Sequence, residues 1–255
     1  MTKNSKNQQK SRDFAQKVRL MFDNIARRYD LANHLLSGGV DFIWRRKAVK
    51  LAKSNKDARL LDMCCGTGDL AFCFARHSGI GEAVGCDFSE EMIRLAQRKE
   101  DKLARKGKLA NVQFNWQTAD CTDTGFESES FDVISCGFGV RNMADLDAGL
   151  AEMHRLLRPG GKVCILEFTL PECIVCRSLY LLYLRYILPI LGGIITSRLS
   201  AYRYFADSIL DWVKKVELEK SLEAAGLKKI QTRSLSKGIA KVYVFEKGLN
   251  IAKGL

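Results

Sequence analysis

The stretch LLDMCCGTGD at residues 60–69 decides the fold expected for this chain. A short apolar run contains Asp62, a glycine loop follows at Gly66 and Gly68, and a helical pattern begins at Asp69. A glycine loop directly after a strand lets a ligand approach the backbone at the carboxyl end of the strand, where α/β sheets bind cofactors. The stretch therefore predicts a cofactor site on a mainly parallel sheet.

Short β-rich runs alternate with helical patterns from Arg59 onward, which is typical of a doubly wound α/β domain. Strands are expected at residues 60–63, 83–87, 112–117, 131–136, 163–167, 229–234 and 240–246. Helices are expected at residues 69–76, 90–105, 145–157 and 214–225. Seven strands that end in an antiparallel hairpin favour a methyltransferase-type sheet over a plain dinucleotide-binding fold.

The basic side chains gather at the N-terminal end. Residues 1–59 carry a net charge of +10 from 15 basic and five acidic side chains, out of +12 for the whole chain. Apolar residues recur at helical spacing between the basic residues of 13–28, which predicts an amphipathic basic helix. An anionic membrane surface or a nucleic acid could bind such an end, and a solvated face is the alternative. Residues 1–58 are therefore expected to form a basic N-terminal helical segment.

Composition places the chain among single globular domains. It is 255 residues long and 47% apolar, so it can bury a sizeable core. Nine cysteines, an odd number scattered through apolar runs, suit a reduced compartment, and the cytosol is expected. The C-x-x-C pair Cys173 and Cys176 is interpreted as small buried side chains in preference to a zinc or redox site. His34, His77 and His154 show no metal spacing, so no metal site is predicted.

Acidic residues near the ends of successive strands indicate which cofactor the loop binds. Asp87 follows Gly68 by 19 residues and could accept hydrogen bonds from both ribose hydroxyls. Asp69 puts a carboxylate at the helix start, where a pyrophosphate would have to lie. Asp62 adds a negative charge beside the same site, and Asp120 could accept from an adenine amino group. A ligand with a ribose, an adenine and a cationic tail fits these acids, and S-adenosylmethionine is such a ligand.

Further motifs extend this interpretation along the chain. They are MFDNIARRYDLAN at residues 21–33, LSGG at 36–39, WR at 44–45, CGTGDL at 65–70, FGVRN at 138–142, LEF at 166–168 and YRYF at 202–205. By these motifs the chain, from about Val18 to Lys247, resembles the ubiquinone/menaquinone biosynthesis C-methyltransferase family, of the demethylmenaquinone methyltransferase type. The GTG loop is shared by many methyltransferases, whereas the Tyr-Asp and Gly-x-Arg-Asn elements together are specific.

The resemblance implies an α/β fold of the class I S-adenosylmethionine-dependent methyltransferases, with a Rossmann-like seven-stranded sheet, N-terminal helices and a helical insertion after the fifth strand. The methyltransferase domain is expected at 59–248 and the substrate-side insertion at 170–212. The residues expected to bind S-adenosylmethionine are Asp62, Gly66, Thr67, Gly68, Asp87, Asp120, Cys121 and Gly137. Gly137 replaces a serine of some members, so its contact can come only from the backbone. Tyr243 stands where the family commonly has a histidine.

The resemblance also implies a polyprenylated quinol as methyl acceptor, with demethylmenaquinol converted to menaquinol. A benzoquinol of ubiquinone biosynthesis is the alternative. A phenol has a pKa of about 10, so a group that stabilises the phenolate would make the ring carbon nucleophilic. Arg141 is expected to hold the phenolate or orient a water, with Asn142, Tyr29 and Asp30 around the ring. In the alternative interpretation, Arg141 is a surface residue flanking the helix near Asp145.

Two other function classes fit the sequence less well. A nucleic-acid methyltransferase would share the fold and the positive end, but residues 136–139 read CGFG where an amino-methylating enzyme would have Asn/Asp-Pro-Pro-Tyr/Phe. No nucleic-acid partner is therefore expected. A binding module without activity would not need the intact acids and loop.

The apolar stretch at 179–196 contains Arg185 and Pro189 and is not expected to span a membrane. It is expected to be either a lid or groove for an isoprenoid tail, or a buried helix that caps the sheet. With the basic N-terminal end, it favours peripheral association of a cytoplasmic protein with the inner face of an anionic membrane. The sequence leaves open the ring type, the tail length and whether the chain forms a homo-oligomer.

Overall fold

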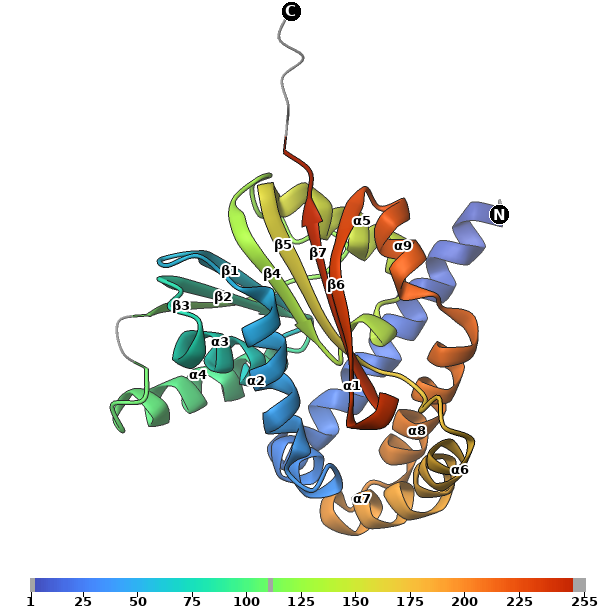
Figure 1. Ribbon diagram of the computed structural model, residues 1–255. Coiled ribbons are helices and arrows are strands. Elements are labelled where there is room, and N and C mark those ends of the chain that lie inside the picture. The colour runs from blue at the N-terminus through green and yellow to red at the C-terminus, as the bar shows by residue number, and fades with distance from the viewer. Residues whose placement is uncertain (1–2, 110–111, 250–255) are drawn as a thin grey trace, which may run out of the picture.

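The computed structural model describes residues 3–109 and 112–249. Met1 and Thr2 of the basic N-terminal end lie outside the described residues, and so do the charged side chains before Asp13. The described residues form one seven-stranded sheet with helices on both faces (Figure 1).

The strand order is β3-β2-β1-β4-β5-β7-β6. The strands are β1 (Arg59–Met63), β2 (Glu82–Asp87), β3 (Gln113–Thr118), β4 (Phe131–Gly137), β5 (Leu157–Phe168), β6 (Leu227–Leu235) and β7 (Ala240–Lys247). Neighbours from β3 to β5 run parallel, and β7 runs antiparallel to both β5 and β6. Within the described residues, the seven expected strands and the late antiparallel hairpin are confirmed.

Helices cover both faces of this sheet and gather at the carboxyl ends of its strands (Figure 1). They are α1 (Lys3–Leu36), α2 (Val40–Ala52), α3 (Asp69–His77), α4 (Glu90–Ala104), α5 (Leu146–Leu156), α6 (Ile174–Leu182), α7 (Leu188–Thr196), α8 (Leu199–Lys215) and α9 (Leu218–Ala224). The first helix is longer than the amphipathic segment that the sequence predicts.

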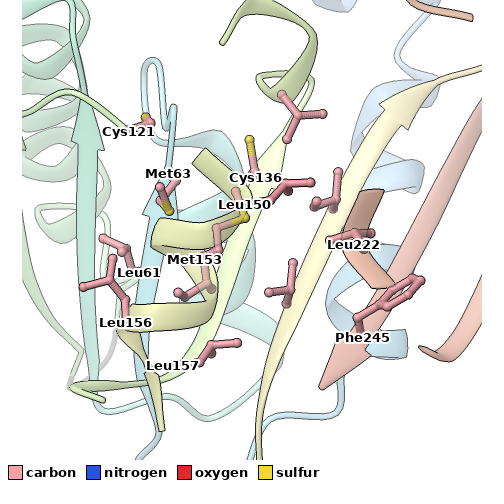
Figure 2. Packing of buried hydrophobic residues seen from close by; sticks show 14 of the residues in the cluster. Leu61, Met63, Cys121, Cys136, Leu150, Met153, Leu156, Leu157, Leu222 and Phe245 are labelled. Carbon is pink, nitrogen blue, oxygen red and sulfur yellow. The ribbon is translucent and has the colours of Figure 1, made fainter. Parts of the chain in front are cut away.

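Strand β1 shows why the sheet is buried on both faces. Leu61 and Met63 pack in one cluster with side chains of α5 and α9, whereas Leu60, the residue before them, packs in a second cluster with α2 and α3. Successive side chains of a strand point to opposite faces, so a continuous apolar run predicts a strand covered on both sides. Figure 2 shows the first cluster, in which Leu222 of α9 packs near Phe245 of β7.

Two expected helix boundaries are wrong. The helix predicted at 214–225 is the end of α8 followed by α9, because the backbone of Val216 is extended and interrupts the helix. Helix α5 ends at Leu156 rather than at Leu157. Leu157 has an extended backbone and pairs with Phe131, which makes it the first residue of β5. In both cases tertiary packing overrides the local helical pattern.

A continuous helical segment follows β5. Helices α6 and α7 are joined by a π-helical turn at Tyr183–Ile187, and the resulting 23 residues, 174–196, are long and apolar enough to cross a bilayer. Tyr180, Leu184 and Leu188 on its inner side are buried against α1 and α8. Large apolar side chains on its outer side are exposed, so a fully buried helix capping the sheet is the wrong alternative for this insertion.

Candidate active site

The loop between β1 and α3 requires glycine at position 68. Gly68 has a φ of 81°, in the left-handed region that favours glycine, and a Cβ there would lie 2.5 Å from a ring carbon of Trp116. Gly66 also has a positive φ of 55°. The two glycines let the chain turn sharply from the end of β1 into the first turn of α3. They thereby expose the backbone of the loop at the sheet edge.

Asp62 of β1 forms hydrogen bonds with the elements beside this loop. One carboxylate oxygen accepts the backbone N–H of Ala71 at 3.1 Å, and the other accepts the hydroxyl of Ser135 at 2.6 Å. Asp62 is buried, and this burial raises the pKa of its carboxyl to about 7. These contacts fasten α3 and β4 to β1, so Asp62 has a structural part besides the cofactor role expected for it.

Asp87 orients the loop from the end of β2. Its two oxygens accept the backbone N–H groups of Gly66 at 2.9 Å and Ser89 at 3.0 Å. Burial raises the pKa of Asp87 to about 7. A carboxylate oxygen has more than one lone pair, so these two hydrogen bonds leave acceptor capacity for ribose hydroxyls. Its role toward the ribose stays a prediction.

The two residues expected near the adenine differ in their surroundings. Asp120 is exposed, and one of its oxygens accepts the backbone N–H of Thr122 at 2.9 Å and the Thr122 hydroxyl at 2.7 Å. Cys121 is buried, and its sulfur lies 3.1 Å from that of Cys64. Neither contact tests the expected adenine binding.

A cavity of about 580 Å³ lies beside the glycine loop. Among the residues expected to bind the cofactor, those that line it are Asp62, Gly66, Thr67 and Gly137, whereas Gly68, Asp87, Asp120 and Cys121 do not. At Gly137 a Cβ would lie 3.1 Å from Leu70, so this position offers mainly backbone. Another wall is apolar and consists of side chains from the segment after β5, including Leu179, Tyr183, Leu184 and Leu188.

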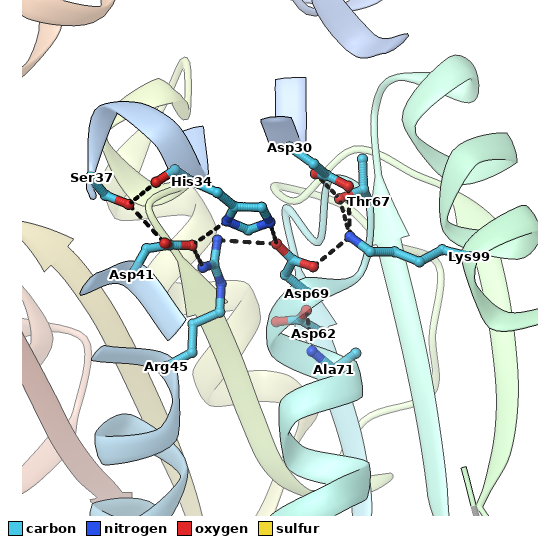
Figure 3. A network of polar contacts seen from close by, with 10 residues as sticks. All are labelled: Asp30, His34, Ser37, Asp41, Arg45, Asp62, Thr67, Asp69, Ala71 and Lys99. Carbon is cyan, nitrogen blue, oxygen red and sulfur yellow. Dashed lines mark hydrogen bonds and ion pairs between the residues drawn. The ribbon is translucent and has the colours of Figure 1, made fainter. Parts of the chain in front are cut away.

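A polar network centred on Arg45 closes one side of the cavity (Figure 3). The buried guanidinium of Arg45 forms an ion pair with Asp41 and lies 3.4 Å from an oxygen of Asp69. The His34 ring contacts Asp41 at 2.7 Å and lies 3.6 Å from Asp69. Burial opposes ionisation of Asp41, yet the guanidinium of Arg45 holds the pKa of that carboxyl below its ordinary value. The network therefore joins α1 and α2 to the start of α3.

Lys99 of α4 extends this network to α1. Its ammonium contacts Asp30 at 2.7 Å and also pairs with Asp69 (Figure 3). The hydroxyl of Thr67 donates to Asp30 at 2.6 Å. Burial acts against the charge on Asp69, but Arg45 and Lys99 together hold its pKa below the ordinary value. Asp30 thus fastens the end of α1 to the glycine loop.

His34, Asp41 and Asp69 bring potential metal-ligand atoms within 4.8 Å of one another, although the sequence predicts no metal site. The guanidinium of Arg45 already lies between the two carboxylates, and Lys99 pairs with one of them. A divalent cation would have to displace or face these positive charges. The group therefore fits an ion-pair network better than a metal centre.

Arg141 is buried, with 2% of its side chain exposed, so the alternative that places it on the surface is wrong. Its guanidinium forms an ion pair with the fully buried Glu167 at 2.9 Å and donates to the backbone carbonyl of Phe138. The rings of Phe168 and Phe205 lie 5.3 and 5.0 Å from its central carbon. Arg141 does not line the large cavity, whereas Phe138, Phe168 and Phe205, which it contacts, do.

Of the other three expected catalytic residues, one lines the cavity and two do not. Tyr29 lines the cavity, and burial raises the pKa of its hydroxyl. Asp30 is bound in the network beside the cavity. Asn142 is outside the cavity lining and accepts the Tyr204 hydroxyl at 3.3 Å. No direct contact with a substrate ring is tested for any of them.

Sequence reasoning missed the cations nearest the cofactor loop. Trp44-Arg45 is part of the family pattern, but Arg45 lies in an ordinary basic helical stretch and received no role. Lys99 and Asp30 are 69 positions apart, and no periodicity links them. Only the fold brings them together.

Comparison with known proteins identifies the family. Residues 8–247 match the model of the ubiE/COQ5 methyltransferase family. The chain belongs to this family. It is an S-adenosylmethionine-dependent C-methyltransferase, and the buried acids around its glycine loop fit that cofactor.

Individual relatives agree with this assignment. The methyltransferase is 40% identical over 233 residues to the ubiquinone/menaquinone biosynthesis C-methyltransferase of Geotalea daltonii, which covers 91% of this chain and 97% of that protein. It is 37% identical to the demethylmenaquinone methyltransferase of Thermus thermophilus, over 88% of this chain and 98% of that protein. An S-adenosylmethionine-dependent methyltransferase structure from Thermotoga maritima shares the fold with a TM-score of 0.57 at 18% identity, over 89% of this chain and 98% of that one.

Asp87→Asn should weaken S-adenosylmethionine binding roughly thirtyfold or more, because it removes the charged acceptor for the ribose hydroxyls. In the unaltered enzyme the pKa of about 7 makes Asp87 increasingly ionised as the pH rises. Affinity should therefore increase between about pH 6 and 8, and Asp87→Asn should lose the part of this dependence that comes from Asp87, whereas Asp62, whose pKa is also about 7, keeps its own part. Titration calorimetry measures both effects. Asp211→Asn, at an exposed acid, is the control, and identical pH profiles for the two variants would refute the role of Asp87.

Arg141→Ala should destabilise the fold by about 3–5 kcal/mol, because it leaves the buried Glu167 carboxylate without a partner. Replacing both residues by methionine should restore part of that loss. Urea unfolding measures the difference. A single variant as stable as the unaltered enzyme would show that the pair contributes little.

Turnover of Arg141→Lys separates a catalytic part from this structural one. The ammonium keeps a positive charge opposite Glu167, but it cannot reproduce the planar fork of the guanidinium. We expect kcat to fall roughly 100-fold with cofactor affinity unchanged. Normal turnover would assign Arg141 to the support of the site alone.

Proposed function

We propose that this methyltransferase methylates a ring carbon of a polyprenylated quinol in quinone biosynthesis, and that its substrate is demethylmenaquinol. The observation that carries the proposal is the cavity, which extends from the cofactor loop to an apolar wall. The relative from Thermus thermophilus is named for demethylmenaquinone, and the relative from Geotalea daltonii for both ubiquinone and menaquinone biosynthesis. A benzoquinol is therefore the competing substrate.

The lining of the cavity changes from polar to apolar across its width. Gly66, Thr67 and Gly137 line it at the carboxyl ends of the central strands, whereas Leu179 and Leu188 line it from the segment after β5. S-adenosylmethionine supplies a methyl group that its sulfonium already activates. The chain then has to hold the quinol ring in line with that methyl group and exclude water. An isoprenoid tail would lie along the apolar wall.

Of the four expected catalytic residues, Tyr29 and Asp30 lie at or beside the cavity, whereas Arg141 and Asn142 are outside its lining. Tyr29 borders the cavity and can contact the ring, while Asp30 fixes Tyr29 and α1 through its bonds to Thr67 and Lys99. Arg141 contacts the backbone carbonyl of Phe138 and the rings of Phe168 and Phe205, and these rings line the cavity. Its contact with a phenolate would require these rings to move aside. Otherwise it acts by positioning the carbonyl of Phe138.

A competition assay tests the substrate. The enzyme is given methyl-labelled S-adenosylmethionine and equal amounts of a demethylated naphthoquinol and a demethylated benzoquinol with the same tail. We expect the label to enter the naphthoquinol at least about tenfold faster, as one well-filled pocket can discriminate to that degree. Preferential labelling of the benzoquinol would reverse the substrate assignment, and labelling of neither would overturn the proposed function.

We also propose that the face formed by α6 and α7 rests on the membrane. Its exposed large apolar residues are Ile174, Val175, Leu179, Leu182, Tyr186, Ile187, Ile190, Leu191 and Ile194. Leu31, Leu35, Phe42 and Ile43 around the α1–α2 junction are also exposed, and the Tyr183 hydroxyl donates to the Leu36 carbonyl at 2.6 Å to join the two regions. Contiguous apolar surface of this kind marks an interaction site. A tail could pass from the cytoplasmic leaflet into the cavity.

Vesicle binding checks this surface. Each basic residue near an anionic membrane contributes about 1 kcal/mol and is screened by salt, so co-sedimentation should decrease as salt rises. Ile194→Glu should weaken binding roughly tenfold or more, because Ile194 is 72% exposed and the change places a charge on the apolar face. Ile230→Glu, at an exposed residue of β6, is the matched control. If both variants bind the vesicles equally, the α6–α7 face is not the membrane-binding surface. If neutral and anionic vesicles retain the protein equally, the basic N-terminal end is only a solvated face.

A further inference from the structure

The C-x-x-C pair lies at the start of α6, and one of its two residues lines the cavity. Cys173 is the residue that precedes the helix, and Cys176 lies in its first turn. Cys173 is exposed and Cys176 is partly exposed, so the sequence interpretation of both as buried side chains is wrong. Cys176 lines the cavity, next to Tyr180 and Leu179. One thiol therefore faces solvent, and the other faces the space proposed for the quinol.

The surroundings of this pair favour thiol chemistry. The backbone N–H and the thiol of Cys176 face the sulfur of Cys173 and lower the pKa of the Cys173 thiol. Cys173 also lies at the N-terminus of a nine-residue helix, whose partial positive charge favours a thiolate. The thiol of Cys176 has a raised pKa and keeps its proton. The pair thus combines a thiolate with a neighbouring proton donor.

We propose that the Cys173–Cys176 dithiol reduces a quinone bound in the cavity to the quinol. This inference rests on the proposed function, because methyl transfer to a ring carbon needs the electron-rich quinol and cannot use the quinone. A dithiol at the cavity wall would let the enzyme take up either redox form of its substrate. The class of ligand is a para-quinone, and the class of reductant that regenerates the pair is a small thiol or dithiol.

The reaction balances with two electrons and two protons. The sulfur of Cys176 bonds to a carbonyl carbon of the quinone, and its proton goes to the carbonyl oxygen. The thiolate of Cys173 then attacks the sulfur of Cys176, which forms the disulfide and breaks the carbon–sulfur bond. The electron pair of that bond enters the ring and leaves the opposite oxygen as a phenolate, which takes a proton from water. An external thiol finally reduces the disulfide through exchange at exposed Cys173.

A second pair of thiols fits this reaction less well. The sulfurs of Cys64 and Cys121 are 3.1 Å apart beside the cofactor loop. Cys121 is 6% exposed, however, and it does not line the cavity. Regeneration requires a sulfur that a second thiol can attack, and in this pair that sulfur is Cys64, which lines the cavity that the quinone itself would occupy. In the pair at the start of α6, Cys176 lines the cavity and Cys173 is exposed to solvent.

The test measures quinone reduction without S-adenosylmethionine. The full chain is reduced, freed of reductant without oxygen and mixed with a naphthoquinone that carries methyl groups on both carbons of its quinoid double bond, which blocks thiol addition there. We expect about one quinol per chain, as a single dithiol carries two electrons. Mass spectrometry should find a disulfide between Cys173 and Cys176. Cys173→Ser should reduce the quinone at least about tenfold more slowly, whereas Cys73→Ser, at a partly exposed thiol of α3, should behave as the unaltered enzyme.

Methyl transfer is measured separately with a quinol that has been reduced chemically. Cys173 belongs neither to the cofactor loop nor to the residues that line the cavity, so Cys173→Ser should methylate this quinol at the normal rate. Equal quinone reduction by Cys173→Ser, or a disulfide between Cys64 and Cys121 with Cys173 still reduced, would overturn the inference. Quinone reduction without any methyl transfer would leave the dithiol activity standing and refute the proposed methylation. Methylation without quinone reduction would support the proposed methylation and refute the dithiol activity.

Discussion

The buried guanidinium of Arg45 is the interaction on which the rest of the site depends. A charge removed from water needs partners, and Arg45 finds them in Asp41 of its own helix and Asp69 at the start of α3. Lys99 shares Asp69 and reaches Asp30 of α1. These few pairs join four helices around the glycine loop. Their burial makes the arrangement cooperative, because the loss of one partner leaves another charge unpaired.

This charged side of the cavity explains how one enzyme can bind two unlike ligands. The loop and the acids beside it present polar groups where a cationic cofactor fits, and burial raises the pKa of Asp62 and of Asp87 to about 7. The segment after β5 presents apolar side chains to the same cavity and more of them to the outside. One helical segment thus serves as cavity wall and as outer apolar face. The position of Cys176 on that wall is what connects the thiol pair to the ring-binding space.

Glu167 and Arg141 form a second buried pair deeper in the fold. Glu167 comes from the end of β5, and its carboxylate also accepts the backbone N–H of Phe168 at 2.9 Å. The pair therefore fixes the chain where it leaves the sheet and enters the helical insertion. The aromatic rings that cover Arg141 are part of the same cavity. Arg141 of the FGVRN motif can therefore influence the space proposed for the quinol through the Phe168 and Phe205 rings packed against it.

The sequence by itself determined the seven strands, the glycine loop and the helical insertion, because each depends on local spacing of apolar residues and glycines. It also determined the family, through motifs such as FGVRN at 138–142. It did not determine the break at Val216, the burial of Arg141 or the exposure of Cys173. These depend on contacts between distant parts of the chain, as do the partners of Arg45 and Lys99. Only the tertiary structure decides them, because a side chain carries no periodic signal of the charge or ring it will meet after folding.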